Sequence, residues 1–212
     1  MDPAFWRQRW ENKETGWHES KPNPLLVKHL PRLALAKDRR IFVPLCGKTL
    51  DVSWLLSRGY RVSGAELSQL AVEQLFMDLG MQPDVVAAGE LEQWSATGLD
   101  IFVGNIFALS RKALGTIDAV YDRAALVALP PEVRSRYTGH LIELTNKAPQ
   151  LLICYDYDQD LMEGPPFSVS GEEIRRHYAE AYDVKLLAST DVSGGLKGKC
   201  PATENVWLLA RP

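Results

Sequence analysis

Short apolar runs of strand length alternate with amphipathic segments of helix length along most of the chain. In the first half, the pattern predicts strands over residues 41–46, 61–66 and 100–105, and helices over 50–57 and 68–79. Ser68 is a suitable N-cap for the second helix, and Gly59 and Gly80 end the two helices. In the second half, it predicts strands over 117–121 and 150–155, joined by a helix over 131–144. Strands that alternate with helices imply a parallel sheet covered on both faces.

The C-terminal quarter of the chain has a different pattern. Strand-like runs at 184–188 and 205–210 follow one another directly, and the loop between them contains the glycine-rich stretch 193–199. Two successive strands without a helix between them suggest an antiparallel hairpin that closes the sheet. Long loops are usually functional or mobile, so the loop is a candidate for a functional role.

The first two strands and the helix between them form a βαβ unit of the kind that opens a nucleotide-binding site. The first strand breaks at Gly47, where a ligand can approach the backbone. Glu66 ends the second strand, 19 residues after Gly47, where a carboxylate can accept hydrogen bonds from both hydroxyls of a ribose. Buried strands also end on acidic residues by chance, so the residues around Glu66 must show whether it marks a nucleotide-binding site.

Two phosphate-binding motifs fail at this turn. A dinucleotide fingerprint needs three glycines, and only Gly47 is present, which disfavours NAD. The stretch from Gly47 to Thr49 resembles the end of a P-loop, but Phe42 stands where the phosphate cradle requires glycine, which disfavours ATP. A ligand with an adenosine but no phosphates, such as S-adenosylmethionine, fits a short first turn with few glycines.

Composition narrows the class of partner. With 212 residues the chain is long enough for one α/β domain with a sizeable core. Its formal net charge is −3, and it lacks the basic stripe that nucleic acid requires. No run approaches the roughly 20 apolar residues that span a bilayer, and the first residues lack the apolar region of a secretory signal. A small-molecule partner and a cytoplasmic location are expected, with no membrane association.

Cysteine and histidine residues show no ligand spacing. The three cysteines, Cys46, Cys154 and Cys200, are odd in number and far apart, which indicates neither disulfides nor a zinc site. Cys46 and Cys154 end apolar runs and are interpreted as small hydrophobic residues. The four histidines are scattered as well, so no metal is expected.

A set of short segments carries a family resemblance over essentially the whole chain. The segments are Trp6-x-x-x-Trp10 with Trp17 after it, Pro44-Leu45-Cys46-Gly47-Lys48, Gly64-Ala65-Glu66-Leu67-Ser68, Asn105-Ile106-Phe107, Tyr121-Asp122-Arg123-Ala124-Ala125-Leu126-Val127-Ala128 and Gly164-Pro165-Pro166-Phe167. In these residues the chain resembles the thiopurine S-methyltransferases, in particular their bacterial members. These are class I enzymes that use S-adenosylmethionine.

The resemblance implies a fold and an organisation. It implies one methyltransferase domain over residues 1–212, with a Rossmann-like α/β sheet of seven strands, the last of them antiparallel, and helices on both faces. Residues 1–30 would form an aromatic lid, and the protein would be a monomer. An antiparallel last strand agrees with the hairpin that the pattern predicts.

The resemblance also implies a set of cofactor contacts, which are Trp10, Leu45, Glu66, Asn105, Ile106 and Arg123. In this interpretation Leu45 offers backbone beside the methionine part, and Glu66 binds the ribose. Asn105 hydrogen-bonds the adenine and Ile106 packs on it. An ordinary core position is an almost equally good interpretation of Ile106. It is a weaker one for Asn105, because a polar residue that ends an apolar strand usually has a partner.

Arg123 and Asp122 are the candidates for catalytic residues. A guanidinium at the carboxyl edge of the sheet can hold the cofactor carboxylate with two hydrogen bonds, or face an anionic substrate. The alternative for Arg123 is a salt bridge with Asp122 or Glu132. Asp122 is a weak candidate for a general base and has a structural alternative of its own.

The N-terminal tryptophans are the candidates for substrate contacts. Trp6 and Trp10 share one face of a predicted helix, and their spacing alone favours a core anchor. Trp17 belongs to the loop that follows. The resemblance favours a lid over a flat aromatic substrate, with Trp6 and Trp17 in contact with it.

The expected reaction is displacement at the sulfonium methyl group by the thiolate of an aromatic or heterocyclic thiol such as a thiopurine. It needs orientation and exclusion of water more than a strong base or a metal. Selenium or tellurium oxyanions, or another small-molecule acceptor, remain alternatives for the methyl acceptor. A domain that binds S-adenosylmethionine without turnover is the alternative from another class.

Overall fold

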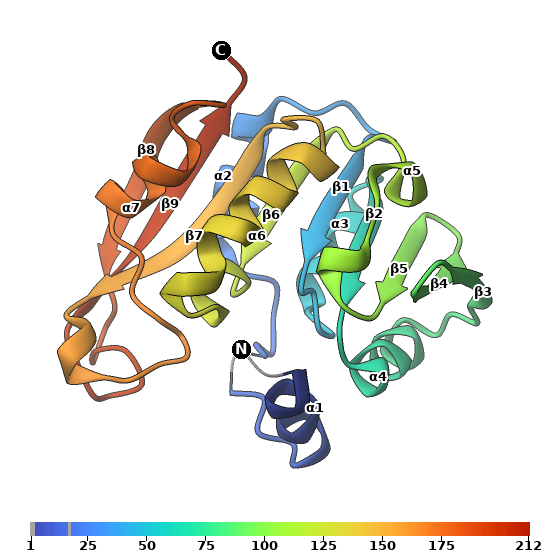
Figure 1. Cartoon of the computed structure of the whole chain (residues 1–212), viewed down its shortest axis with the longest axis horizontal. Helices are drawn as coiled ribbons and strands as arrows, with labels where there is room; N and C mark the ends of the chain where they lie inside the picture. The colour runs from blue at the N-terminus through green and yellow to red at the C-terminus, as the bar shows by residue number, and fades with distance from the viewer. Residues whose placement is uncertain (1–2, 17) are drawn as a thin grey trace.

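In the computed structural model, which describes residues 3–16 and 18–212, nine strands form one sheet in the order β3-β4-β5-β2-β1-β6-β7-β9-β8 (Figure 1). The strands are β1 Arg40–Pro44, β2 Arg61–Glu66, β3 Asp84–Ala88, β4 Leu91–Ala96, β5 Leu99–Val103, β6 Ala119–Arg123, β7 Gln150–Tyr157, β8 Asp183–Asp191 and β9 Ala202–Ala210. The helices are α1 Pro3–Glu11, α2 Pro24–His29, α3 Leu50–Ser57, α4 Gln69–Leu79, α5 Arg111–Leu114, α6 Pro131–Leu144 and α7 Gly171–Tyr178. Single 3-10 turns lie at Leu30–Leu33, Ile106–Ala108, Leu126–Ala128 and Gln159–Leu161.

The centre of the sheet is parallel, as the alternation of strands and helices predicts. Strands β5, β2, β1, β6 and β7 are parallel neighbours, with Val43 opposite Gly64 in the β1–β2 pair. Strand β9 is antiparallel to both β7 and β8, which confirms the C-terminal hairpin. Because β8 then runs parallel to β7, the loops after both strands emerge at the carboxyl edge of the sheet.

Two strands, β3 and β4, extend the sheet beyond the seven that the resemblance implies. They form a hairpin whose second strand is antiparallel to β5. Val85 and Val86 in β3 are 48% and 56% exposed, so this edge strand lacks the apolar periodicity by which buried strands are predicted from sequence. Backbone pairing and the packing of Leu91 and Trp94 against the cores hold the hairpin in place, and the class of the fold is unchanged.

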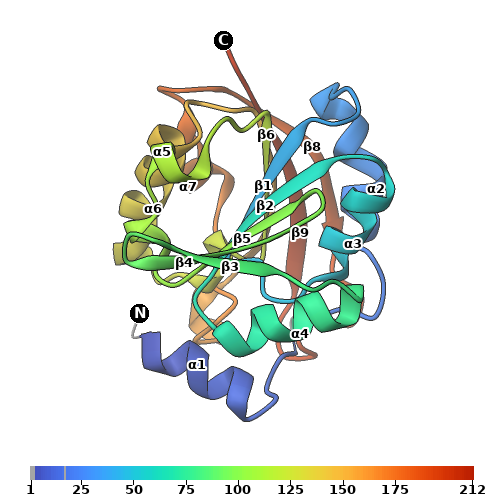
Figure 2. The same ribbon diagram turned by 90° about the vertical axis from the view of Figure 1, so that its right-hand side faces the viewer.

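Helices cover both faces of the sheet (Figure 2), with α2, α3 and α4 on one side and α5, α6 and α7 on the other. Each side encloses an apolar core: one is centred on Ile41, Leu55 and Phe76, and the other on Phe42 and Leu141. Neighbouring residues Ile41 and Phe42 point to opposite faces, as the pleat of a strand requires. The two cores fill the space between the sheet and the helices on each of its faces.

Capping residues in the sequence determine where helices α3 and α4 begin and end. The Ser68 side chain accepts a hydrogen bond from the backbone of Ala71 at 3.3 Å and caps α4, as predicted. Gly80 ends the same helix in the left-handed conformation, with φ of 63°. Thr49 caps α3 by accepting from the backbone of Asp51 at 3.3 Å. No described helix is both long and apolar enough to cross a bilayer.

Candidate active site

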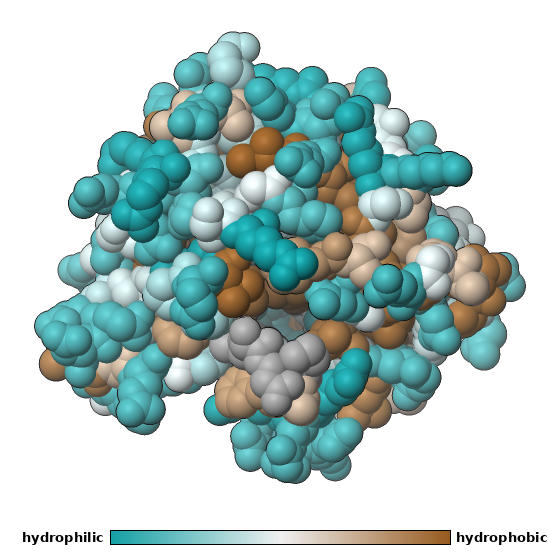
Figure 3. Space-filling model, viewed as in Figure 1, coloured by the Kyte–Doolittle hydropathy of each residue, from teal (hydrophilic) through white to brown (hydrophobic). Residues whose placement is uncertain are grey.

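A cavity of about 690 Å³ opens at the carboxyl edge of the sheet. The loops after β1, β2, β5 and β6 line one part of it, and α1 together with the loops after β7 and β8 lines another. Figure 1 shows α1 against this edge, and Figure 3, in the same view, shows a mostly polar surface with apolar residues beside a hollow in its lower middle. The volume lies in the range of small-molecule sites, and the position is where open α/β sheets bind ligands.

The turn after β1 is built around the carboxylate of Glu66. Its Oε2 accepts a hydrogen bond from the backbone of Gly47 at 2.8 Å, and its Oε1 accepts one from Ser68 at 2.8 Å. Burial raises the pKa of Glu66, and the hydrogen bonds from Ser68, Gly47 and Leu67 partly offset that effect. A carboxylate has about four lone-pair sites, so Glu66 can still accept from a ligand in the cavity that it lines.

Two residues of this turn have backbone conformations in the left-handed region. Leu45 has φ of 47° and Gly47 has φ of 53°. A Cβ on Gly47 would also lie 2.9 Å from the ring of Trp10, so the glycine is needed for two reasons. Leu45 is not a glycine, and an aliphatic residue held there by its surroundings is typical of functional turns.

Asn105 and Ile106 follow β5 and line the cavity. The Asn105 side chain accepts a hydrogen bond from the backbone of Phe107 at 3.1 Å and caps the short turn that begins at Ile106. The Ile106 side chain is buried, and its carbonyl oxygen lies 2.8 Å from Nε2 of His140. Asn105 therefore has a structural partner of its own, in addition to its position at the cavity.

Arg123 ends β6 and lines the cavity, where it pairs with Glu19. The sequence alternatives for its partner were Asp122 and Glu132, so Glu19 is a residue that the sequence analysis missed. Burial lowers the pKa of Arg123, but Tyr121 and Glu19 more than compensate and raise it above its usual value. The guanidinium is thus a permanent charge, and its carboxylate partner comes from the N-terminal segment.

Asp122 does not line the cavity, and its side chain is fully buried. Its Oδ1 accepts from the backbone of Leu126 at 3.1 Å, and its Oδ2 accepts from the hydroxyl of Tyr137 at 2.8 Å. Burial raises the pKa of Asp122 to about 6. This placement joins β6 to α6 and directs both carboxylate oxygens to Leu126 and Tyr137.

Beneath the first turn, Asp51 and Tyr121 form a second buried network that the sequence analysis missed. Oδ1 of Asp51 accepts from the backbone of Asn23 at 2.7 Å, and Oδ2 accepts from the hydroxyl of Tyr121 at 2.9 Å. Burial and the neighbouring Asp51 raise the pKa of Tyr121 well above its usual value, so the phenol stays protonated. Both side chains line the cavity and join the start of α3 to β6.

Helix α1 closes one side of the cavity. Trp6 and Trp10 both line it, and the Trp10 side chain is only 4% exposed. Trp10 packs directly on Gly47 and belongs to neither of the two cores on the faces of the sheet. Helix α1 therefore contacts the first turn through Trp10, at the wall of the cavity. Trp17 lies outside the described residues.

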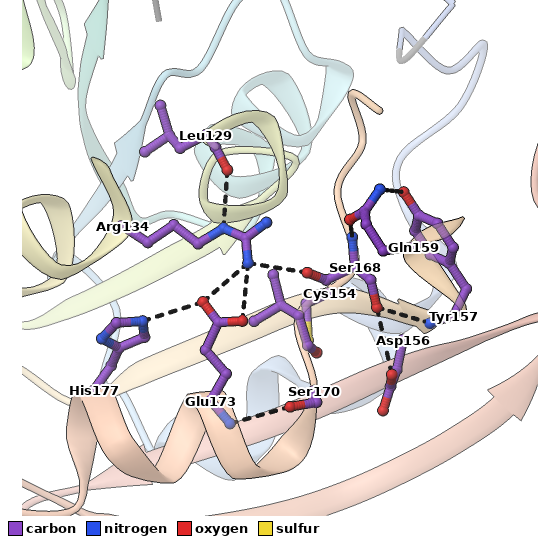
Figure 4. Close-up of polar contacts among 11 residues, drawn as sticks. Leu129, Arg134, Cys154, Asp156, Tyr157, Gln159, Ser168, Ser170, Glu173 and His177 are labelled. Atoms are coloured by element: carbon purple, nitrogen blue, oxygen red, sulfur yellow. Dashed lines mark hydrogen bonds and ion pairs between the residues drawn. The ribbon is translucent and has the colours of Figure 1, made fainter. Parts of the chain in front are cut away.

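Residues 158–170, after β7, form another wall, to which Pro165 and Pro166 contribute. Figure 4 shows how the guanidinium of Arg134 holds this wall. It donates to the carbonyl oxygen of Ser168 at 3.0 Å, to that of Leu129 at 2.9 Å and to both oxygens of Glu173 at 2.9 Å. The sequence pattern gave no sign of this role, since Arg134 stands in a helix where a surface cation is the usual interpretation.

The cysteines are buried and free, as expected of small apolar residues. Burial raises the pKa of Cys46 well above its usual value and that of Cys154 to about 12, so both stay protonated. Over residues 3–16 and 18–212, no three His, Cys, Asp or Glu side chains are grouped so that they could hold a metal ion.

The family model described as thiopurine S-methyltransferase matches residues 1–211 of the chain. A thiopurine S-methyltransferase of Xanthobacter autotrophicus is 57% identical over 212 residues, which cover 100% of both chains. One of Gluconobacter oxydans is 50% identical over 207 residues, which cover 98% of this chain and 94% of the relative. Both relatives are bacterial, in agreement with the resemblance read from the sequence.

Solved structures share the fold at low sequence identity. A 1,6-didemethyltoxoflavin-N1-methyltransferase of Burkholderia thailandensis, with bound 1,6-didemethyltoxoflavin and S-adenosylhomocysteine, has a TM-score of 0.66 and 13% identity over 98% of this chain and 87% of its own. An S-adenosylmethionine-dependent methyltransferase of Anabaena variabilis has a TM-score of 0.61 and 16% identity over 99% and 95%. These neighbours confirm the class I methyltransferase fold.

Proposed function

The chain belongs to the thiopurine S-methyltransferase family and is an S-adenosylmethionine-dependent S-methyltransferase. We propose that its cavity binds S-adenosylmethionine together with an aromatic or heterocyclic thiol, to which the methyl group is transferred. The observation that carries the proposal is the buried carboxylate of Glu66 at the end of β2. It is oriented by two backbone N–H groups and lies on the cavity wall. A carboxylate held in this way suits the two hydroxyls of a ribose.

The other cofactor contacts follow from position. The guanidinium of Arg123 can bind the cofactor carboxylate with two hydrogen bonds. In this structure it pairs with the carboxylate of Glu19. Leu45 brings the backbone of the first turn to the cavity. Asn105 offers a hydrogen bond to the adenine, and Ile106 offers an apolar surface on which the adenine packs. Trp10 closes the turn from above. When bound, S-adenosylmethionine supplies a methyl group that its sulfonium already activates.

The chain's own contribution to the reaction is orientation and the exclusion of water. Trp6 on α1 and the Pro165–Pro166 wall offer flat apolar surfaces for an aromatic ring, and Trp17 stays a proposed contact. Asp122 is turned away from the cavity, so we assign no general base and propose that the acceptor reacts as a thiolate without a metal. We further propose a monomer in the cytoplasm with a small-molecule acceptor, and no nucleic acid or membrane partner.

The test is an assay with labelled S-adenosylmethionine against a panel of thiols, phenols, amines and selenium or tellurium oxyanions. We expect transfer to aromatic and heterocyclic thiols, at a rate that rises with pH through the pKa of the acceptor thiol. EDTA should leave the rate unchanged. Methyl transfer to the oxyanions and to none of the thiols would refute the proposed thiol acceptor. Loss of activity with EDTA that Mg²⁺ or Zn²⁺ restores would refute the metal-free mechanism.

Substitution of Glu66 by Ala should weaken the binding of S-adenosylhomocysteine by about 10–150-fold. The change removes a charged acceptor from two hydroxyls, a loss of roughly 1.5–3 kcal/mol. Calorimetry measures the affinity, and circular dichroism checks the fold, because Gly47 and Ser68 lose their partner as well. Glu73→Ala, on the exposed face of α4, is the matched control and should bind like the parent. Unchanged affinity in a folded Glu66→Ala protein would remove the ribose contact from the proposal.

A further inference from the structure

Lys197 is presented to the cavity by a short, ordered turn within the β8–β9 loop. The backbone of Leu196 donates to the carbonyl oxygen of Cys200 at 2.8 Å, and the two residues form an isolated antiparallel bridge around the turn. Leu196 and Cys200 are buried in a third apolar cluster with Tyr157. The Lys197 side chain lines the cavity, and its Nζ donates to the carbonyl oxygen of Pro165 at 2.6 Å.

Arg9 reaches the same cavity from α1. Its guanidinium lies 4.7 Å from the centre of the Phe5 ring, and its nearest carboxylate, Glu14, is 3.8 Å away. The Nε atom is buried and has no hydrogen-bond partner among the described residues. Burial lowers the pKa of Lys197, and the charges of Arg9 and Lys199 lower it further, so the two cations at the cavity repel one another.

The carboxylates that line the cavity are engaged elsewhere. Glu19 pairs with Arg123, and Glu66 holds two backbone N–H groups. Asp51 accepts from Asn23 and Tyr121. Burial raises the pKa of Glu204, and its neighbours Tyr155 and Arg123 partly offset that rise. The other cations at the cavity are also occupied: Lys48 lies 3.7 Å from Asp78, and Arg136 lies over the Phe107 ring. Arg9 and Lys197 differ from these cations in two ways: Nε of Arg9 is buried without a hydrogen-bond partner among the described residues, and Nζ of Lys197 donates to a neutral carbonyl oxygen, that of Pro165.

We propose that Arg9 and Lys197 form an anion subsite at the mouth of the acceptor cavity, and that the enzyme prefers aromatic thiols that carry a carboxylate on the ring. The inference rests on the proposed function, because it places the acceptor between Trp6 and the Pro165–Pro166 wall. With its thiol directed into the cavity, the ring carries its charged substituent outward, toward these two side chains. An anionic group there removes the repulsion between the cations and satisfies Nε of Arg9.

The subsite is tested by comparing 4-mercaptobenzoate with thiophenol in parallel assays, at a pH at which both are thiolates. In the parent, kcat/KM should be higher for the carboxylate. Arg9→Gln and Lys197→Gln should each lower the ratio of the two kcat/KM values roughly five- to tenfold. This loss is larger than that of an exposed ion pair and smaller than that of a buried hydrogen bond to a charged group. Glutamine at position 197 keeps a donor for the Pro165 carbonyl oxygen while removing the charge.

Arg7→Gln and Lys199→Gln are the matched controls, since both residues are exposed and neither lines the cavity. They should leave the ratio within twofold of the parent value. Lys197→Glu should reverse the preference, so that thiophenol becomes a better acceptor than 4-mercaptobenzoate, because the new carboxylate repels the one on the ring. A ratio that responds to neither Arg9→Gln nor Lys197→Gln overturns the subsite.

Binding separates this inference from the proposed function. In the presence of S-adenosylhomocysteine, calorimetry compares the thioether 4-(methylthio)benzoate with thioanisole on the parent and on the Arg9→Gln and Lys197→Gln variants. Tighter binding of the carboxylate that depends on both cations supports the subsite even if no thiol is methylated, a result that would refute only the proposed acceptor. Equal binding of the two thioethers overturns the subsite even if both thiols are turned over.

Discussion

Deletion of residues 1–17 should leave a protein that unfolds cooperatively but turns over aromatic thiols at least about 100-fold more slowly. Helix α1 belongs to neither of the two cores on the sheet, yet Trp6 and Trp10 line the cavity. The truncation would open the cavity to water and remove a stacking surface for the acceptor. Poor positioning alone can cost on the order of 10²-fold in rate.

Thermal unfolding and steady-state kinetics on the truncated and full chains measure the two effects. Hydrogen exchange adds a third, because a lid gains stability from its ligand. Exchange in residues 3–16 should slow when S-adenosylhomocysteine and an aromatic acceptor bind. Glu11→Gln and Lys13→Gln, exposed changes at the end of α1 and just beyond it, should leave turnover near the parent value. A truncated chain that fails to fold would show a core anchor, and one with full activity would show that the tryptophans have no function.

The parallel half of the sheet could be predicted from the sequence because its strands are buried on both faces. The run at 41–46 is continuous in apolar residues, whereas the run at 61–66 is marked by Gly59 before it and Glu66 at its end. Each run ends close to its observed boundary. Polar groups at those strand ends, Glu66 above all, mark the edge where the cavity lies. The β3–β4 hairpin could not be predicted, since Val85 and Val86 in its edge strand are exposed and its apolar positions follow no strand periodicity.

Residues of the candidate site could be predicted from the sequence where they stand at the end of a strand. They could not be predicted where a distant segment of the chain brings a residue to the site. Leu45, Glu66, Asn105, Ile106 and Arg123 all line the cavity, together with Trp6 and Trp10. Glu19, by contrast, is separated from Arg123 by 104 positions, and no periodicity links them. Asp122 adjoins Arg123 in the sequence, but the pleat of β6 turns neighbouring side chains to opposite faces. That alternation is why only one of the pair reaches the cavity.

Substitution of Arg134 by Met should lower the free energy of unfolding by about 3–5 kcal/mol, as expected when one partner of a buried ion pair is removed. The Arg134 side chain is 1% exposed, and that of Glu173 is 15% exposed. Methionine fills part of the space but leaves the Glu173 carboxylate without its main partner and frees the carbonyl oxygens of Leu129 and Ser168. In a chain of this size the melting temperature should fall by roughly 6–20 °C.

The double variant Arg134→Met/Glu173→Met separates the ion pair from the packing. It should recover much of the lost stability, because an apolar pair can replace a buried ion pair at little cost. Arg175→Met, on the exposed face of α7, is the control and should melt within a few degrees of the parent. A single Arg134→Met variant as stable as the parent would show that the pair is not needed for folding.

The same variant should also affect catalysis, because Arg134 holds Ser168 and with it the wall that contains Pro165 and Pro166. The cofactor contacts that we propose for Glu66 and Arg123 come from β2 and β6 and not from that wall. We therefore expect Arg134→Met, assayed well below its melting temperature, to raise KM for the acceptor while its affinity for S-adenosylhomocysteine stays near the parent value. Equal losses at both ligands would instead indicate a general loosening of the fold.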